Sequence, residues 1–201
     1  MQKLVCLDLE GVLIPEIWMA VAVKTGVEEL LRTTREEPDY NKLMRYRLEL
    51  LARHTITLPQ IQEVIGTLHP LEGAADFLNW LRAQTQVVIL SDTFAEFARP
   101  LMKQLGWPTL FCHSLEVQPD GRITDYYLRQ PDPKFKAVRA FQSLNLHVIA
   151  AGDSYNDLSM LQTADQGILF RPPDSLVQEQ PQFPVAREHG ALREIFAKHL
   201  S

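Results

Sequence analysis

Four short apolar runs, separated by stretches of helical periodicity, constrain the fold of this chain more than any other feature. Each run is rich in Val, Ile and Leu and matches one buried strand; the runs cover residues 3–9, 86–91, 147–152 and 167–170. Between the runs, apolar residues recur at helical spacing, as at Ala74, Phe77, Leu78 and Leu81. This alternation predicts an α/β fold, with a mostly parallel sheet between two helical layers and ligand sites at the carboxyl ends of the strands.

The segment after the first run does not continue this alternation. About 60 residues separate that run from the helix that begins near Gly73, which is too many for a simple connection. Helical patterns occur near residues 16–25, 40–53 and 58–66. We therefore expect a small helical cap of residues 15–72, inserted after the first strand into a core of residues 1–14 and 73–201.

Two more elements are predicted nearer the C-terminus. The segment "SLEVQPDGRITDYYLR", which begins at Ser114, places a Pro-Asp-Gly turn between two β-prone arms. This pattern predicts a hairpin that forms a flap or an edge of the sheet. Residues 191–199 have a helical pattern and are expected to pack on the core.

Composition and charge limit the function classes. The 201 residues carry a formal net charge of −5 and contain no run of Lys or Arg, which argues against a nucleic acid or an anionic membrane as partner. No apolar stretch approaches the ~18 residues that span a bilayer, and the first ten residues lack a signal-peptide pattern, so a cytoplasmic protein is predicted. Cys6 and Cys112 are expected to be buried thiols, and the six histidines lack the spacing of a zinc site.

Two acids follow the first apolar run. In "LVCLDLEGVL", Asp8 and Glu10 are two positions apart, so their side chains are expected to point the same way from the strand end. Close carboxylates repel each other unless a cation neutralises them, and an oxygen-only cluster suits Mg²⁺ better than zinc. The pair therefore predicts a magnesium site.

Further acids follow the third run, in "GDSYND". Asp153 and Asp157 would reach the same edge of the sheet as Asp8, because the carboxyl ends of parallel strands lie together. Taken alone, the segment could also be a turn with an Asx cap that leads into a helix.

A hydroxyl and a lysine complete the set. Ser91 ends the second run just before a helix whose N-terminal amides could bind an anion, and two prolines hold Lys134 near a helix start. Alone, Ser91 could be an N-cap and Lys134 a surface residue. Together with the four acids, each at a strand end or helix start, they indicate phosphoryl transfer.

The motifs "LDLEGVL", "LSDTF", "DPK" and "GDSYND" resemble those of the haloacid dehalogenase (HAD) superfamily, whose phosphatases use an aspartate nucleophile. A helical cap directly after the first motif is similar to that of the phosphoserine phosphatases. Glu as the second acid of the first motif most resembles their phosphoserine phosphatase/homoserine phosphotransferase branch, called ThrH. The resemblance implies a HAD-like three-layer α/β/α core with a helical cap, Mg²⁺ as cofactor and phosphoserine as substrate.

The same resemblance assigns roles to individual residues. Asp8 would be the nucleophile and Glu10 the general acid/base. Four residues would hold or order the metal: Asp8, Glu10 through its carbonyl, Asp153 and Asp157, the last orienting the metal's water shell or Lys134. Four groups would contact the phosphate: Ser91, the Asp92 amide, Lys134 and Asn156.

Two cap residues would select the substrate. Arg47 continues an apolar stripe on the helix expected at 40–53, and the resemblance makes it the partner of the substrate carboxylate. From periodicity alone, its head group could instead extend outward to solvent. The resemblance makes Glu16 the partner of the substrate ammonium, although after Pro15 it could simply favour the positive end of a helix.

Two residues depart from the usual family pattern. Glu10 is one methylene longer than the usual Asp, which could slow hydrolysis relative to transfer to an alcohol such as homoserine. Asp92 stands where many relatives have glycine and adds negative charge near the substrate. Two alternatives stay open: a HAD phosphatase of another small phosphorylated metabolite, and a non-catalytic, receiver-like phosphate-binding module. Monomer and homodimer are both open.

Overall fold

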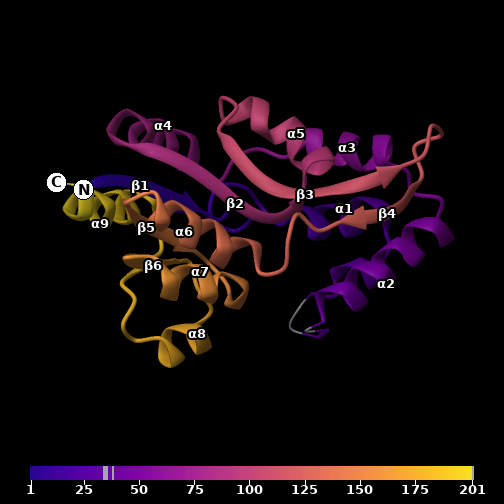
Figure 1. The fold of residues 1–201 in the computed structure, drawn as a ribbon. Helices are drawn as coiled ribbons and strands as arrows, with labels where there is room; N and C mark the ends of the chain where they lie inside the picture. The colour runs from indigo at the N-terminus through magenta and orange to yellow at the C-terminus, as the bar shows by residue number, and fades with distance from the viewer. Residues whose placement is uncertain (34–35, 38, 201) are drawn as a thin grey trace.

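A seven-stranded sheet forms the centre of the computed structural model, which describes residues 1–33, 36–37 and 39–200 (Figure 1). The strands are β1 (Gln2–Leu7), β2 (Gln86–Phe94), β3 (Thr109–Val117), β4 (Ile123–Tyr127), β5 (Leu146–Gly152), β6 (Gln166–Phe170) and β7 (Val185–Ala186). Their order in the sheet is β4-β3-β2-β1-β5-β6-β7, and the β3–β4 pair alone is antiparallel among these described strands. The predicted, mostly parallel α/β sheet is confirmed.

Helices cover both faces of this sheet. They are α1 (Ile17–Thr25), α2 (Tyr40–Arg53), α3 (Leu58–Gly66), α4 (Ala74–Gln84), α5 (Ala95–Gln104), α6 (Pro133–Ser143), α7 (Leu158–Thr163), α8 (Asp174–Glu179) and α9 (His189–Leu200), with short 3₁₀ turns η1 (Glu28–Leu31) and η2 (Tyr155–Asp157). Within the described residues, none of the helices combines the length and the apolar composition needed to cross a bilayer.

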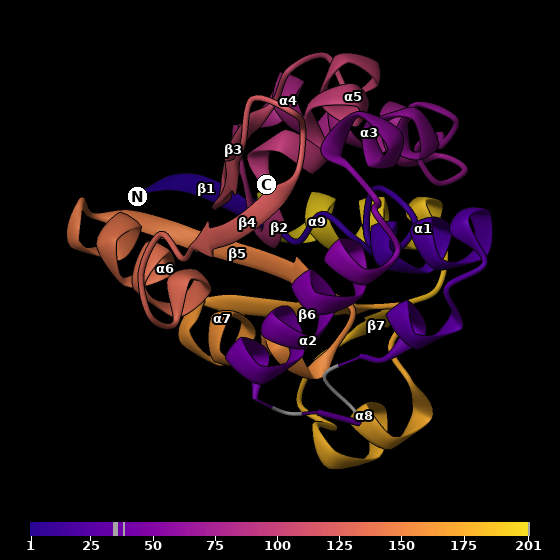
Figure 2. The ribbon, with the colours of Figure 1, turned by 90° about the vertical axis from the view of Figure 1, so that its right-hand side faces the viewer.

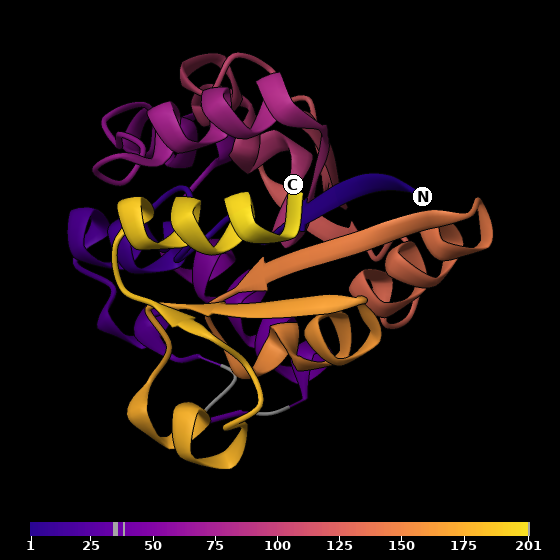
Figure 3. The same cartoon turned by 90° about the vertical axis from the view of Figure 1, so that its left-hand side faces the viewer.

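Alternate residues of β1 feed two hydrophobic clusters, as expected for a strand buried on both faces. Val5 and Leu7 pack in the cluster that includes residues of α4, α5 and α9, whereas Leu4 and Cys6 pack in the cluster of α6, α7 and α8. The first helical layer is visible in Figure 3, where the yellow α9 lies beside the purple α4. The expected three-layer α/β/α core is therefore present.

The helices predicted near residues 16–25, 40–53 and 58–66 form as α1, α2 and α3. They lie toward the end of the sheet where β1 and β5 finish; in Figure 2, the arrowhead of β5 points toward the side of the molecule that holds α1 and α2. Most of their buried apolar residues join the cluster on the α4 side of the sheet. The division of the chain into a core and a cap of residues 15–72 stays a prediction.

The predicted hairpin forms as β3 and β4, at one edge of the sheet. It also contacts α2, because Arg45 forms an ion pair with Asp125 (2.9 Å) and the Tyr126 hydroxyl donates to Asn41 Oδ1 (2.7 Å). The predicted C-terminal helix forms as α9 and buries Leu192 and Phe196. Both cysteines are free thiols; Cys6 is buried as predicted, whereas Cys112 is only partly buried.

Candidate active site

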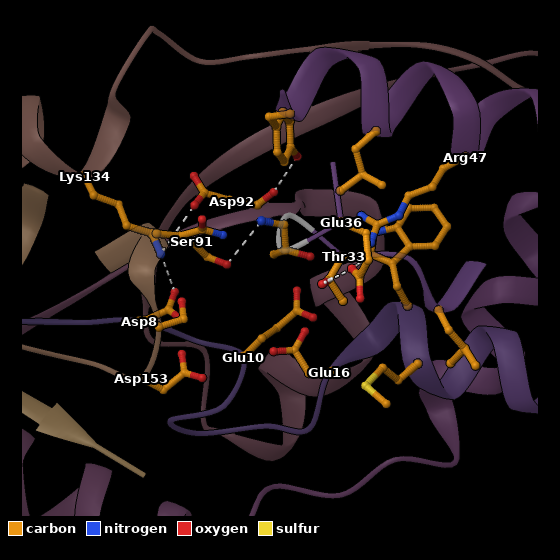
Figure 4. Close-up of a pocket in the computed structure, with 18 residues that line it drawn as sticks. Asp8, Glu10, Glu16, Thr33, Glu36, Arg47, Ser91, Asp92, Lys134 and Asp153 are labelled. Atoms are coloured by element: carbon orange, nitrogen blue, oxygen red, sulfur yellow. Dashed lines mark hydrogen bonds and ion pairs between the residues drawn. The ribbon is translucent and has the colours of Figure 1, made fainter. Parts of the chain in front are cut away.

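Three neighbouring strands, β2, β1 and β5, carry the polar motifs to one edge of the sheet (Figure 4). Asp8 follows β1, Ser91 lies near the end of β2, and Asp153 follows β5. The Asp8 N–H donates to the Ala151 carbonyl (2.9 Å), which extends the β1–β5 pairing beyond β1. The chain proceeds to opposite sides of the sheet after β1 and after β5, so the motifs meet at the topological switch point.

Lys134 is the cation at the centre of this site. It lies in the first turn of α6, and its buried Nζ donates to Asp8 Oδ1 (2.8 Å) and Asp157 Oδ1 (2.7 Å). Burial opposes its charge, but the carboxylates of Asp157, Asp8 and Asp92 outweigh burial and raise the pKa of Lys134 well above its usual value. Lys134 is thus a buried ammonium beside Asp8, and the surface-lysine alternative is wrong.

Asp8, Asp153 and Asp157 form an acidic cluster in which one carboxylate oxygen of each residue lies within 4.8 Å of the others. Burial, reinforced by the neighbouring negative charges, raises the pKa of Asp153 to about 8 and that of Asp8 well above its usual value. Ionising these groups together is therefore costly. A closely spaced set of hard oxygen ligands fits a divalent cation such as Mg²⁺, which would offset the repulsion.

Asp157 organises the loop after β5. Its Oδ2 accepts hydrogen bonds from the backbone N–H groups of Asp153 (2.9 Å) and Ser154 (3.1 Å), while its Oδ1 accepts one from Lys134. Ser154 and Asp157 also form a capping box at η2, so "GDSYND" is a turn that leads into a helix, as the alternative interpretation expects, but its N-cap is Ser154 and not an Asx residue. These contacts favour the expected role of Asp157 in orienting Lys134.

Gly11 allows the first motif to pass close to the acidic cluster. Its φ of +78° lies in the left-handed region, which favours glycine. A Cβ at this position would also lie 2.5 Å from the carboxyl carbon of Asp153. The glycine after "LDLE" is therefore required both by the turn and by the neighbouring carboxylate.

Glu10 has the environment of an acid/base group. Its Oε2 accepts a hydrogen bond from the Ile17 N–H at the start of α1 (2.8 Å), and Thr93 also hydrogen-bonds to its carboxylate. Burial, followed by the charge of Glu16, raises the pKa of Glu10 to about 7 against the effect of these hydrogen bonds. A carboxyl group with this pKa can both donate and accept a proton near neutral pH.

The Asp92 carboxylate is balanced by two cationic or polar neighbours. Lys134 Nζ lies 3.4 Å from its Oδ2, and His113 Nε2 lies 3.7 Å from its Oδ1. Burial alone would raise the pKa of Asp92, but Lys134 and His113 together lower it to about 2. The negative charge that departs from the family pattern is therefore offset inside the protein.

Ser91 is held by the turn that ends β2. Its Oγ accepts a hydrogen bond from the Thr93 N–H (3.2 Å), and its side chain reaches the same pocket as Asp8. The N-cap of the following helix α5 is Phe94, so the interpretation of Ser91 as a helix cap is wrong.

A pocket of about 450 Å³ connects these groups with the helices α1 and α2 (Figure 4). Nine of the ten predicted site residues line it: Asp8, Glu10, Glu16, Arg47, Ser91, Asp92, Lys134, Asp153 and Asn156. Asp157, the tenth, lies behind it, fully buried. Glu16 and Asn156 are the exposed members of the set.

Arg47 is buried in the wall of the pocket formed by α2. One of its nitrogens, Nη2, donates to the Arg32 carbonyl (2.8 Å), and the guanidinium carbon lies 4.6 Å from the centre of the Trp18 ring. The buried Nε has no hydrogen-bond partner, and no carboxylate of the described residues lies within ion-pair distance of the guanidinium. Burial lowers its pKa to about 10. Glu10 and Glu16 offset its charge only from beyond ion-pair distance. A buried cation without a direct ion-pair partner is costly, so this site fits an anionic ligand; the outward-pointing alternative is wrong.

Three side chains that sequence reasoning did not assign to the site also belong to it. Tyr40 lines the pocket and donates its hydroxyl proton to the Asp92 carbonyl (2.9 Å), which joins α2 to the end of β2. Trp18 lines the pocket beneath Arg47, and His113 supports Asp92 from β3. The inward stripe of α2 was a usable signal for Tyr40, whereas a lone histidine has no spacing that marks it.

Comparisons with known proteins agree with this geometry. A model of the haloacid dehalogenase-like hydrolases matches residues 2–165. Phosphoserine phosphatase ThrH of Pseudomonas aeruginosa is 56% identical over 98% of this chain and 96% of its own length. A phosphoserine phosphatase of Pseudomonas syringae pv. tomato is 56% identical over 98% of this chain and 83% of its own.

Solved structures show the same fold at low sequence identity. The structure of a phospho-aspartyl intermediate analogue of phosphoserine phosphatase superimposes with a TM-score of 0.79 at 23% identity, covering 98% of each chain. An apo form of phosphoserine phosphatase gives a TM-score of 0.78 over the same coverage. With the family match over most of its length and a relative of more than half identity, the chain belongs to the haloacid dehalogenase-like hydrolases.

Proposed function

We propose that the chain is a Mg²⁺-dependent phosphoserine phosphatase that acts through an aspartyl-phosphate at Asp8. The observation that supports this proposal is that the pocket has a phosphate-binding set of residues at one end and a buried cation at the other. Asp8, Lys134 and the acidic cluster lie at one end, and the buried Arg47 guanidinium, which has no direct ion-pair partner among the described residues, lies in the wall formed by α2. A small molecule with a phosphate and a carboxylate matches both features.

The chemistry starts at Asp8. Its carboxylate attacks the phosphorus of the substrate, and the bond between phosphorus and the serine oxygen breaks. Lys134, Ser91 and the Asp92 amide would bind the non-bridging oxygens, so the charge of a loose transition state is met by groups that are already in place. Forming an acyl-phosphate divides one difficult displacement into two easier ones.

Glu10 would serve both halves of the reaction. In its protonated form it donates to the departing serine oxygen, which would otherwise leave as a poor alkoxide. The resulting carboxylate then takes a proton from the water that attacks the acyl-phosphate and releases inorganic phosphate. A pKa of about 7 suits this exchange of roles near neutral pH.

The acidic cluster would hold Mg²⁺. Its ligands would be the Asp8 carboxylate, the Glu10 carbonyl and Asp153, while Asp157 orients Lys134 from behind. When bound, the ion supplies positive charge that compensates the negative charge gathered on the phosphoryl group and the nucleophile.

The cap residues 15–72 would select the amino acid. Arg47 can form a two-point contact with the substrate carboxylate, and Glu16 at the pocket mouth would contact the ammonium. Homoserine carries the same two groups and a hydroxyl, so we also infer that it can accept the phosphoryl group from Asp8 in place of water. A relative named ThrH at 56% identity supports this second activity.

The test is phosphate release from L-phosphoserine with Mg²⁺, by the wild type and by Asp8→Asn. The variant keeps the shape of the side chain but cannot form the acyl-phosphate, so we expect release to be abolished. Equal release by both proteins would overturn the nucleophile assignment. Adding homoserine to the wild-type reaction should yield phosphohomoserine beside inorganic phosphate, and its absence would remove the transfer activity from the proposal.

Arg47→Ala tests the substrate class. We expect KM for phosphoserine to rise ~10- to 100-fold, since a charge-assisted contact worth about 1.5–3 kcal/mol is lost. Hydrolysis of an aryl phosphate, which has no carboxylate, should change little. Arg53→Ala, an exposed arginine on the same helix, is the matched control. Equal losses on both substrates would instead indicate a damaged pocket.

A further inference from the structure

His189 contacts both connections between the core and the cap. It is the first residue of α9 and is 5% exposed. Its Nε2 lies 2.9 Å from the carbonyl oxygen of Val12, in the outgoing connection, and its Nδ1 lies 2.8 Å from the carbonyl oxygen of Glu72, in the returning one.

Both ring nitrogens of His189 face hydrogen-bond acceptors. A carbonyl oxygen only accepts hydrogen bonds, so each contact is a hydrogen bond only where that ring nitrogen carries a proton. The ring also packs against two aromatic rings in tilted geometry: the centres of the Phe170 and Phe77 rings are 4.6 and 5.6 Å from its own. The two distances are matched in full only by a ring that donates from both nitrogens.

The position of these contacts gives them a function. The two connections are also bonded directly, because the Leu71 N–H donates to the Leu13 carbonyl (2.9 Å). Val12 is two residues after Glu10, on the loop that carries the catalytic acids. A Cβ at Gly73, where φ is +79°, would lie 3.3 Å from the His189 Cβ, so glycine keeps the returning connection close to the ring.

We propose that His189 is a positioning residue that hydrogen-bonds both cap connections to α9 through its two ring N–H groups. These hydrogen bonds would fix the position of the Glu10 loop beneath the cap. The effect of His189 on catalysis rests on the proposed function, whereas its two hydrogen bonds to the Val12 and Glu72 carbonyls do not depend on that function. Removing the donors would leave the Val12 and Glu72 carbonyls without this partner and let the Glu10 loop shift relative to the phosphate site.

The hydrogen-bonding state is tested directly by a long-range ¹H–¹⁵N NMR spectrum of the full chain at pH 7, assigned by its loss in His189→Phe. We expect the His189 ring to show protons on both nitrogens. A spectrum of either neutral tautomer would overturn the proposal. This readout does not depend on any activity, so it also stands if phosphoserine proves not to be a substrate.

The positioning role is tested by kinetics of His189→Phe, which keeps the ring and removes both donors. Phosphoserine needs a correctly placed Glu10 to protonate its leaving oxygen, whereas an aryl phosphate has a good leaving group. We expect kcat for phosphoserine to fall ~10-fold or more and kcat for the aryl phosphate to stay within about 2-fold. His54→Gln, at an exposed histidine, is the control. Equal losses on both substrates, or no loss on either, would reject the positioning role.

Discussion

The surroundings of Glu10 determine the pKa of its carboxyl group. Burial and the nearby Glu16 make its ionised form costly, while hydrogen bonds from Ile17 and Thr93 keep it from becoming wholly neutral. The result is a pKa of about 7. The same balance makes two predictions at this position, one for turnover and one for stability.

Glu10→Gln should lower kcat for phosphoserine by ~10² or more, because the amide cannot transfer the proton. KM should change little, since the side chain keeps its size and its contact with the Ile17 N–H. An aryl phosphate distinguishes the transfer of the phosphoryl group to Asp8 from the later hydrolysis of the acyl-phosphate, because its leaving group needs little protonation in the first of these steps. Glu63→Gln, an exposed residue on α3, is the control. Unchanged turnover of phosphoserine would exclude the acid/base role.

The same substitution should stabilise the metal-free protein at high pH. The raised pKa means that the folded wild type holds a proton that the unfolded chain releases, so this part of its stability is present below about pH 4.5 and is lost as pH rises through about 7. Gln has no such loss. The free energy of unfolding is measured by denaturant titration in the presence of a chelator. It should be higher for Glu10→Gln than for the wild type by up to about 3 kcal/mol at pH 8 and by almost nothing near pH 4.5. A difference that does not vary with pH would contradict the assigned environment.

At the residue scale, the sequence predicts groups that belong to a motif and misses those that do not. Asp8, Lys134 and Asp153 follow apolar runs or begin helices, so their place at one sheet edge follows from the topology. His113 and Tyr40 reach the site through contacts between distant elements, the strand β3 and the helix α2. No local pattern encodes those contacts.

Helix α2 carries both a residue proposed to bind the substrate and a residue that holds the helix against the end of β2. Asp39 caps its N-terminus by accepting from two backbone N–H groups, and its inner face carries Tyr40 and Arg47 about two turns apart. Tyr40 bonds the Asp92 carbonyl on the core side, and Arg47 lines the cap wall. A single helix therefore sets the distance between the carboxylate site and the phosphate site.

Tyr40→Phe should loosen this helix from the end of β2. Loss of the hydroxyl removes one neutral hydrogen bond, worth about 1 kcal/mol, and we expect KM for phosphoserine to rise ~5-fold. Tyr46→Phe on the same helix is the matched control, because its ring still packs under Arg32. Equal KM values for Tyr40→Phe and the wild type would show that the hydrogen bond does not hold the pocket closed.

At the element scale, periodicity predicted the helices α1, α2 and α3 and the central strands β1, β2, β5 and β6. The hairpin pattern begins at Ser114, whereas β3 begins at Thr109, because its first half pairs with β2 and not with the hairpin partner β4. The turn sequence predicts the hairpin, but its continuation into the main sheet depends on long-range pairing. Local sequence does not contain that information.

At the scale of the whole molecule, negatively charged side chains lie close together at the carboxyl ends of the parallel strands. Asp8, Asp153 and Asp157 lie together there, and Lys134 offsets only part of their charge. The raised pKa values of Asp8 and Asp153 follow from this crowding and from burial. In the absence of a cation, the fold therefore loses stability as pH rises through about 8.

Mg²⁺ should relieve this loss, and more strongly at higher pH, because protons compete with the ion for the same carboxylates. We expect the Mg²⁺-induced rise in Tm to be larger at pH 8 than at pH 6. Asp153→Asn should abolish most of the rise, whereas Asp76→Asn, an exposed acid on α4, should not. A rise that is equal at both pH values, or retained in Asp153→Asn, would place the ion elsewhere.

The most direct test of the account is the covalent state of Asp8 during turnover. The enzyme is mixed with phosphoserine labelled in its phosphoryl group, quenched in acid within one turnover, and digested for peptide mapping. We predict the label on the peptide of residues 4–13, at Asp8, and no label in Asp8→Asn. A wild-type enzyme that turns over phosphoserine while its label lies on another residue, or on none, would contradict the account.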